Sequence, residues 1–359
     1  MKVMHFITGM DVGGAEHMLL KVISKLKNEN FVVILTKQGA FGKQLEKTGI
    51  KVYELNFSFI KSLMAIIKFK NIIKTEKPDI INSYLIHSNL FARIFGRLFG
   101  IKKIICSVRN KHIDRPFLNR IDAMTQSLVT YYTPNSESVA EFIIKKLKIN
   151  KKKVIVIPNG IEMEQFNFEV DKEKKKNELG IKTKYFFSCI AKFEVQKGHQ
   201  YLLEAIKELA KKRKDFTLLL IGDGSLKKEM EELTIKLGIQ KHVIFTGKRF
   251  DVKEILKAND FTVLPSLYEG MSNTLLEAMA CRCPIVCTNI PENLELVGKD
   301  AITIPPKAVK PLADAINRMI DEKSLRKRYA DRCYEKVKYN SLSNCVSKLE
   351  SLYKKMLGE

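Results

Sequence analysis

Short apolar segments alternate with amphipathic segments along the whole chain. In the first half, β-rich apolar runs lie at 3–8, 31–36, 51–55, 79–83, 104–108, 129–133 and 154–157. Between several of them, apolar residues recur at helical spacing, as at 16–27 and 136–146. Short buried strands separated by amphipathic helices predict a parallel sheet that is covered by helices on both faces.

The second half of the chain repeats this alternation. Its apolar runs lie at 185–191, 217–221, 243–246, 261–265, 285–288 and 301–304, and its helical patterns lie at 201–212, 226–236, 252–257, 274–280 and 309–320. A polar run at 169–178 follows Pro158-Asn159-Gly160 and predicts the linker. The predicted fold class is therefore α/β, with two Rossmann-like domains that face each other across a cleft. Ligands bind beyond the carboxyl ends of parallel strands, so we expect the site there.

Length and composition agree with two ordinary globular domains. The chain has 359 residues, and 45% of them are apolar. No apolar run reaches the roughly 18 residues that span a bilayer, and the N-terminus lacks the features of a signal peptide. The seven cysteines are odd in number and have no second cluster or spaced His that would form a zinc site. A reducing cytoplasm is the expected location.

Positive charge is the strongest bias of the composition. The net charge is +23, and residues 1–165 hold 27 Lys and Arg against 13 Asp and Glu. Such an excess suggests nucleic acid, an anionic membrane or a phosphorylated substrate as partner. A lysine-rich solvated surface explains it equally well. Zero Trp and the lack of a known binding motif argue against nucleic acid.

The segment PSLYEGMSNTLLEAMA, which starts at Pro265, carries the most specific chemistry. Its pattern predicts a strand end, a loop and then a helix that Ser272 or Asn273 caps. Gly270 lets backbone N–H groups approach a ligand, and a helix N-terminus favours negative charge. Glu269 in the loop and Glu277 in the second helical turn can each accept two hydroxyl hydrogen bonds, which suits the diols of a sugar or ribose. Two solvated glutamates are the alternative interpretation.

Five more segments accompany this one, in a fixed order. They are GMDVGGAE from Gly9, VIPNGI from Val156, AKFEVQKGH from Ala191, LIGDG from Leu220 and VIFTG from Val243. Together the six segments resemble glycosyltransferase family 4 over nearly the whole chain. The resemblance implies a retaining enzyme of the GT-B fold. It further implies an acceptor-binding domain at 1–165, a nucleotide-sugar donor domain at 166–340 and a C-terminal helix at 341–359 that returns to the first domain.

The resemblance also implies a role for each residue at the donor. The pair Lys192 and Lys197 would grip the diphosphate, although most relatives have Arg where this chain has Lys192. Glu269 would contact the donor sugar and Glu277 the ribose hydroxyls. The remaining donor residues would be Gly270, Met271 and Ser272 at the helix start, Arg249 or Phe250 near the base, and the loop residues Gly13 and Gly14.

No cofactor or metal ion is expected. As the bond from sugar to phosphate breaks, negative charge grows on the leaving diphosphate, and two ammonium groups plus a helix N-terminus can stabilise it. The Asp-x-Asp pair typical of metal-bridging sites is absent from the sequence. The glycine loop reads Gly-x-x-x-Gly-Gly instead of G-x-G-x-x-G, which argues against NAD.

The acceptor side is less well defined by the sequence. Many relatives have a histidine at the end of the strand at 104–108, and this chain has Arg109-Asn110 there. Arg109 stays protonated and cannot be a base, yet it could hold a phosphate or the donor sugar. His112 and His87 are acceptor-side candidates, and a structural role is the alternative for each. In the retaining mechanism that the resemblance implies, the leaving phosphate itself accepts the acceptor proton, so no protein base would be required.

The segment 57–74, FSFIKSLMAIIKFKNIIK, is both basic and apolar. One interpretation is a helix in a membrane interface, with its lysines on anionic headgroups. The other is an ordinary amphipathic helix packed on the sheet. The predicted partners are a nucleotide sugar and a saccharide or lipid-linked acceptor, and no nucleic acid. The first interpretation of 57–74 adds peripheral contact with an anionic membrane, so the expected location is the cytoplasm, with the inner membrane as the further option.

The predicted reaction is transfer of a hexose or N-acetylhexosamine from a nucleotide sugar, UDP-sugar by family frequency, in bacterial surface polysaccharide assembly. Glu269, Lys197, Lys192 and Arg109 are the catalytic candidates. A sugar-nucleotide epimerase or phosphorylase on the same fold, or a basic nucleic-acid-binding protein, are the alternatives.

Overall fold

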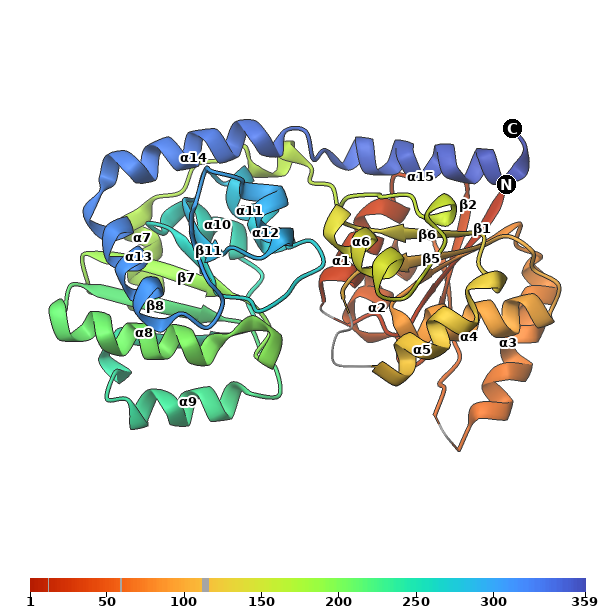
Figure 1. Cartoon of the computed structure of the whole chain (residues 1–359), viewed down its shortest axis with the longest axis horizontal. Helices are drawn as coiled ribbons and strands as arrows, with labels where there is room; N and C mark the ends of the chain where they lie inside the picture. Colours follow the sequence, from red (N-terminus) through yellow and green to blue (C-terminus); the bar gives the residue numbers. More distant parts are fainter. Residues whose placement is uncertain (12, 59, 112–115) are drawn as a thin grey trace. The chain divides into compact units, whose positions relative to one another are not determined.

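The chain forms two compact units. The computed structural model describes residues 1–11, 13–58, 60–111 and 116–359. Unit 1 comprises Met1–Gly160 together with Leu342–Glu359, and unit 2 comprises Ile161–Ser341 (Figure 1). The sequence places the boundary after residue 165, and the chain passes from unit 1 to unit 2 after Gly160.

Unit 1 is a six-stranded parallel sheet with the order β3-β2-β1-β4-β5-β6. Its strands are β1 (Lys2–Ile7), β2 (Glu29–Ile34), β3 (Lys51–Glu54), β4 (Ile80–Tyr84), β5 (Ile104–Val108) and β6 (Tyr131–Pro134). Its helices are α1 (Gly14–Ile23), α2 (Gly39–Lys47), α3 (Ser62–Glu76), α4 (Ile86–Leu98), α5 (Pro116–Met124), α6 (Glu137–Lys145) and α15 (Leu342–Leu357). Successive strands are added outward from β1 on one side and then from β4 on the other, so the strand order reverses between β1 and β4.

One predicted strand of unit 1 is wrong. The range 154–157 forms only an isolated bridge between Tyr132 and Val154, with two further backbone hydrogen bonds to β6. A 3₁₀ turn at Lys151–Lys153 precedes it, and Pro158, which has no N–H group, follows it. Because Pro158 cannot donate a ladder hydrogen bond and the turn precedes Val154 directly, the pairing does not extend in either direction.

Unit 2 is a second six-stranded parallel sheet, with the order β12-β11-β10-β7-β8-β9. Its strands are β7 (Tyr185–Ile190), β8 (Phe216–Ile221), β9 (Val243–Gly247), β10 (Thr262–Leu264), β11 (Ile285–Thr288) and β12 (Ile302–Ile304). Its helices are α7 (Lys172–Glu178), α8 (His199–Lys212), α9 (Lys227–Lys236), α10 (Val252–Ala258), α11 (Asn273–Ala280), α12 (Pro291–Val297), α13 (Val309–Asp321) and α14 (Lys323–Val337). Here the strand order reverses between β7 and β10.

The predicted linker at 169–178 is mostly helical. Asp171 caps α7, because its carboxylate accepts a hydrogen bond from the Lys174 amide over 3.0 Å. Lys172 pairs with Asp260 at 2.6 Å. The polar run is therefore part of unit 2.

Helix α15 completes the core of unit 1 from the far end of the chain. Its inner face packs Leu342, Cys345, Val346, Leu349, Leu352 and Tyr353 against residues of β1, β4 and α1. The Asn82 side-chain amide on β4 donates to the Tyr353 hydroxyl over 2.7 Å. All seven cysteines are buried and none forms a disulfide. In the described parts of the chain, no helix is long and apolar enough to cross a bilayer.

Candidate active site

The strand order of unit 2 brings two predicted motif segments together. β7 and β10 are neighbours, and the loops at their carboxyl ends contain residues 191–198 and 265–272. The Leu267 amide donates to the Gln196 carbonyl over 2.8 Å and joins the two loops. A reversal of strand order is the usual place for a ligand in an open parallel sheet.

Lys197 and Glu269 meet between these loops. The Lys197 Nζ atom lies 2.6 Å from Glu269 Oε1, and the two side chains are 19% and 6% exposed. The Ser266 hydroxyl donates to the same oxygen over 2.6 Å. Among the residues that the structure describes, Glu269 Oε2 receives one long contact, 3.4 Å, from the Gln196 side-chain amide. The carboxylate is thus fixed through Oε1, while Oε2 keeps acceptor capacity for a ligand.

A buried chain of hydrogen bonds supports this carboxylate. The Thr288 hydroxyl at the end of β11 donates to the Ser266 carbonyl over 2.6 Å, and the Asn293 amide on α12 donates to the Thr288 carbonyl over 3.0 Å. Ser266, Thr288 and Asn293 have no exposed surface. The sequence did not single them out, and neither did it single out Gln196. Isolated polar residues form no pattern, and only the adjacency of β7, β10 and β11 gives them a role.

The start of α11 lies directly after Glu269. Ser272 caps the helix, as predicted, because its hydroxyl accepts a hydrogen bond from the Leu275 amide over 3.3 Å. Gly270 is buried and Met271 is half-buried in the loop before the cap. Glu277 is half-buried in the second turn. The first amides of the helix and its dipole make this end of α11 favourable for an anion.

The other predicted donor residues differ in their surroundings. Lys192 is exposed in the bend that follows β7. Arg249 forms two hydrogen bonds to the Asp251 carboxylate, each 2.7 Å long. This bidentate pair uses two of the five N–H donors of Arg249, whose side chain is 31% exposed, whereas the neighbouring Phe250 side chain is 96% exposed. Of the two residues predicted near the base, Phe250 has the more exposed side chain.

The predicted residues of unit 1 lie mainly at its own reversal of strand order. Gly13 is the N-cap residue of α1, after β1, and Gly14 is the first residue of that helix. His87 is exposed in the first turn of α4, after β4. The Thr8 and Ser88 hydroxyls lie 3.0 Å apart and connect the two loops. His112 lies outside the described residues.

Arg109, at the end of β5, packs into unit 1. Its guanidinium lies 5.4 Å from the centre of the Tyr84 ring and donates to the Asn159 side chain over 3.0 Å. Asn159 belongs to the VIPNGI segment, so this contact joins two of the motif segments. Arg109, which is predicted to be catalytic, therefore also connects β5 to the VIPNGI segment through its hydrogen bond to Asn159.

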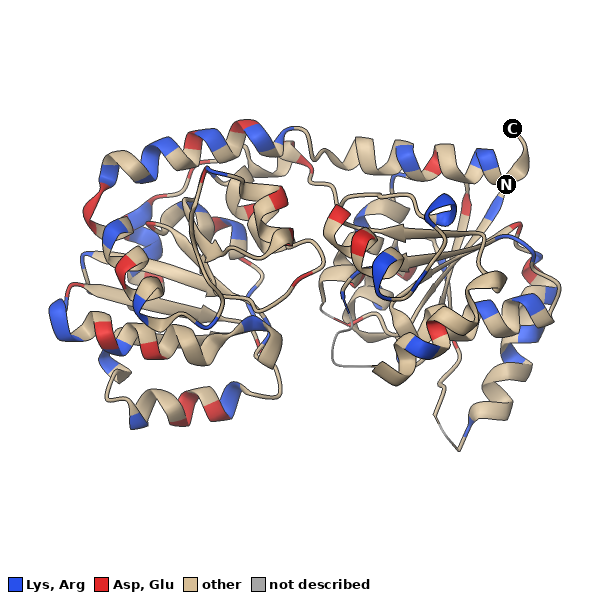
Figure 2. Ribbon diagram, viewed as in Figure 1, with Lys and Arg blue, Asp and Glu red and all other residues tan. Residues whose placement is uncertain are grey.

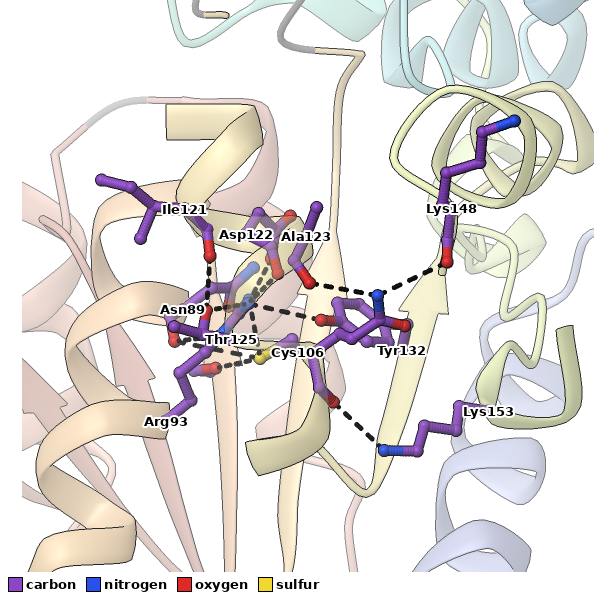
Figure 3. A network of polar contacts seen from close by, with 12 residues as sticks. Asn89, Arg93, Cys106, Ile121, Asp122, Ala123, Thr125, Tyr132, Lys148 and Lys153 are labelled. Carbon is purple, nitrogen blue, oxygen red and sulfur yellow. Dashed lines mark hydrogen bonds and ion pairs between the residues drawn. The ribbon is translucent and has the colours of Figure 1, made fainter. Parts of the chain in front are cut away.

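A buried arginine fixes α4, the helix that carries His87. Arg93 is 1% exposed and pairs with the Asp122 carboxylate of α5 (Figure 3). It also donates to the Asn89 carbonyl over 3.1 Å and to the Thr125 hydroxyl over 3.2 Å. Satisfied buried networks of this kind hold neighbouring elements in one arrangement.

Within residues 1–11, 13–58, 60–111 and 116–359, no group of three or more His, Cys, Asp or Glu is placed to hold a metal ion. The site in unit 2 presents charged groups, backbone amides and a helix N-terminus. A carboxylate, ammonium groups and a helix N-terminus beside a reversal of strand order are suited to an anionic ligand that also carries hydroxyls.

Comparisons with known proteins identify the class. Residues 12–165 match the family described as Glycosyltransferase Family 4, and residues 171–336 match Glycosyl transferases group 1. HepE of Anabaena, solved in complex with UDP and glucose, superimposes with a TM-score of 0.88 at 19% identity and 99% coverage of both chains. The protein is a glycosyltransferase of the GT-B fold.

Two relatives agree with this class over nearly their whole length. A UDP-Gal:alpha-D-GlcNAc-diphosphoundecaprenol alpha-1,3-galactosyltransferase of Escherichia coli is 26% identical, with 95% of this chain and 94% of the relative aligned. An N-acetylgalactosamine-N,N'-diacetylbacillosaminyl-diphospho-undecaprenol 4-alpha-N-acetylgalactosaminyltransferase of Campylobacter jejuni is 23% identical, with 93% and 94% aligned. The chain belongs to glycosyltransferase family 4, as its motifs predict.

Proposed function

We propose that this protein transfers a hexose or N-acetylhexosamine from a UDP-sugar to a lipid-linked saccharide, with retention of the anomeric configuration. The observation that carries the proposal is the Lys197–Glu269 pair, 2.6 Å apart, beside the capped start of α11. The relatives whose names specify lipid-linked diphosphates support the acceptor. The structures of HepE with UDP and with UDP-glucose support the donor.

In this proposal unit 2 binds the donor. Lys197 and Lys192 and the first amides of α11 hold the diphosphate. Glu269 accepts hydroxyl hydrogen bonds of the sugar through Oε2, and Glu277 accepts those of the ribose. Phe250 stacks on the base. As the bond from the sugar to the phosphate oxygen breaks, these positive groups stabilise the charge that grows on the leaving diphosphate.

Unit 1 binds the acceptor in this proposal. His87, His112 and Arg109 are the proposed acceptor residues, whereas Gly13 and Gly14 of the glycine loop remain proposed donor residues. The acceptor hydroxyl forms its new bond on the face from which UDP leaves, and a phosphate oxygen of UDP takes its proton. Arg109 remains charged throughout and contributes only by holding an anionic or hydroxyl group. The protein works at the cytoplasmic face of the inner membrane, without a metal ion.

The test measures UDP release and product formation with a panel of UDP-, GDP- and ADP-sugars and a lipid extract. Lys197→Ala should lower kcat about 100-fold or more, since one preorganised charge at the leaving group is lost. Glu269→Gln should also lower turnover. Lys211→Ala is the matched control, because it breaks a similar ion pair of α8, 2.7 Å from Glu208, on the surface. We expect it to keep wild-type rates.

Several outcomes would contradict the proposal. Wild-type turnover in both Lys197→Ala and Glu269→Gln would remove the site. Loss of activity in EDTA would refute metal independence. Conversion of the donor to its epimer without any acceptor would assign an epimerase, and an inverted product would refute the retaining mechanism.

A further inference from the structure

Helix α3 has two apolar faces, and the core of unit 1 uses only one of them. Ala65, Phe69, Ile72 and Ile73 recur at helical spacing and are buried in the sheet-facing core. The Phe69 ring lies 5.2 Å from Phe6 and 5.3 Å from Phe91. An amphipathic helix packed on a sheet needs no second apolar face.

The second face of α3 is exposed. Leu63, Met64 and Ile67 are 68%, 68% and 51% exposed, and Ile60 in the preceding turn is 93% exposed. At 100° per residue, these positions lie on the side opposite to the buried stripe. Single exposed apolar residues are common, but a cluster of four within two helical turns is not. The ordinary amphipathic helix predicted as one alternative therefore accounts for the buried stripe alone.

Lysines border this apolar face on both sides. Lys61, Lys68, Lys70 and Lys74 are all exposed, and Figure 2 shows several basic residues along α3. At 100° per residue, Lys68 and Lys70 lie on opposite edges of the apolar face, and Lys74 lies in line with it. Residues 55–75 contain no Asp or Glu. Lys61, Met64, Ile67 and Lys68 also line one groove of about 470 Å³, together with Leu55, Asn56 and Asn71. The groove thus combines apolar walls with two ammonium groups.

The geometry points to this face of α3 as a docking surface for an anionic phospholipid bilayer. The apolar centre would enter the boundary between headgroups and acyl chains, and the flanking lysines would contact the phosphates. The surface belongs to unit 1, whereas the donor groups belong to unit 2. Its binding to lipid can therefore be measured without donor, and it does not depend on the proposed sugar chemistry.

The test is flotation of the full chain with two kinds of vesicle, one of phosphatidylcholine alone and one that also contains about 30% phosphatidylglycerol. The anionic lipid is included because each lysine near a negatively charged surface contributes measurably to binding. We expect binding to the anionic vesicles only. Lys61→Glu/Lys68→Glu should weaken this binding about 25-fold or more, because each lysine contributes roughly fivefold. Leu63→Gln/Met64→Gln/Ile67→Gln should weaken it about tenfold or more.

Matched controls separate the surface from general charge and apolarity. Lys151→Glu/Lys152→Glu changes the same charge at two other exposed lysines of unit 1, and Ile235→Gln changes an apolar residue of α9 that is 62% exposed. Both should retain binding within about threefold, because Lys151 and Lys152 belong to a 3₁₀ turn and Ile235 to α9, and neither control changes a residue of the α3 face. All variants should keep the melting temperature and the thermal shift with UDP.

Three results would overturn the inference. The wild type could fail to float with anionic vesicles, or the controls could lose as much binding as the α3 variants. In a third case, sedimentation would show that the wild type is a dimer and that Leu63→Gln/Met64→Gln/Ile67→Gln is a monomer, while both bind vesicles equally. The face would then be a contact between two copies of the chain. If UDP failed to raise the melting temperature of the wild type, this result would contradict the proposed donor site and would leave the inference about α3 unaffected.

Discussion

His199, the first residue of α8, is a buried histidine close to the proposed donor groups. It is 3% exposed and stacks on the Phe193 ring, with the ring centres 4.4 Å apart. Among the described residues, neither of its ring nitrogens has a hydrogen-bond partner. Burial, with a smaller effect of Lys197, lowers the pKa of His199 from 6.5 to about 4. The imidazole is therefore neutral at neutral pH.

This pKa predicts a pH-dependent stability of unit 2. Between pH 6.5 and 4 the unfolded chain binds a proton at His199 that the folded chain does not, so the free energy of unfolding falls as the pH falls through this window, by about 3 kcal/mol. His199→Phe keeps the stacking and removes the titration. We expect its stability at pH 7 within about 1 kcal/mol of wild type, with a flatter decline toward pH 4 in urea unfolding.

The same substitution at His87, which is exposed on α4, is the control and should leave the slope unchanged. An equal slope in wild type and His199→Phe would contradict the prediction.

At the scale of single residues, the sequence predicts charged groups better than their neutral supports. Lys197 and Glu269 come from the resemblance to the family, and the cap at Ser272 comes from capping preference. Ser266 and Thr288 are ordinary polar residues in the sequence, and their role depends on strands that are far apart in the chain. Asp251 stands two residues after Arg249, but the bidentate pair became visible only in the structure.

At the scale of elements, the turn at Gly198 sets the distance between the two donor loops. Gly198 has a φ of 66°, and a Cβ atom there would lie 2.3 Å from the Pro265 carbonyl oxygen. A side chain would therefore meet backbone, which cannot rotate away. The turn needs glycine for its conformation and also for the close approach of the two loops.

Gly198→Ala should destabilise unit 2 and displace Lys197 from Glu269. Gly238→Ala is the matched control, because Gly238 has a φ of 70° and no neighbour within 4 Å of a Cβ atom. The control should lower the free energy of unfolding by about 1 kcal/mol, because alanine is strained in the left-handed conformation. In urea unfolding, Gly198→Ala should lower the free energy of unfolding by at least about 2 kcal/mol more than the control does. It should also weaken UDP binding. Equal costs and equal UDP binding would contradict the proposed close packing of the loops.

The alternation of strands and helices predicts most elements, because buried parallel strands and amphipathic helices have different periods. Two errors show the limits of this pattern. Residues 172–178 contain too few apolar positions to be recognised as a helix, although Asp171 caps them. Residues 154–157 have the composition of a strand, but Pro158 and the preceding turn restrict their pairing.

At the scale of the whole molecule, the class of fold follows from the sequence, whereas the order of the strands does not. Alternating elements indicate two parallel sheets, and the motif order indicates the family. The adjacency of β1 with β4 and of β7 with β10 is a property of the folded sheets. These two adjacencies decide which loops lie together, so the list of candidate residues was available from the sequence but their grouping was not.

Unit 1 contains two segments that are far apart in the chain, and this connection predicts how it unfolds. Tyr353 on α15 has no exposed surface and accepts a hydrogen bond from Asn82 on β4. Tyr353→Ala removes this contact and leaves a cavity, so the free energy of unfolding of unit 1 should fall by about 3–5 kcal/mol. Hydrogen exchange should show faster exchange of the amides of β1 and β4, with unit 2 unchanged.

Tyr339→Ala makes the same substitution at a tyrosine that is 84% exposed, and it should leave the exchange of both units unchanged. Tyr353→Phe should have an intermediate effect of about 1 kcal/mol, because the ring stays and only the hydroxyl is lost. The Asn82 amide also donates to Tyr84 over 2.9 Å, so it keeps one partner in this variant. If Tyr353→Ala left β1 and β4 protected, α15 would be an appendage of unit 1, and the fold of residues 1–160 would not depend on it.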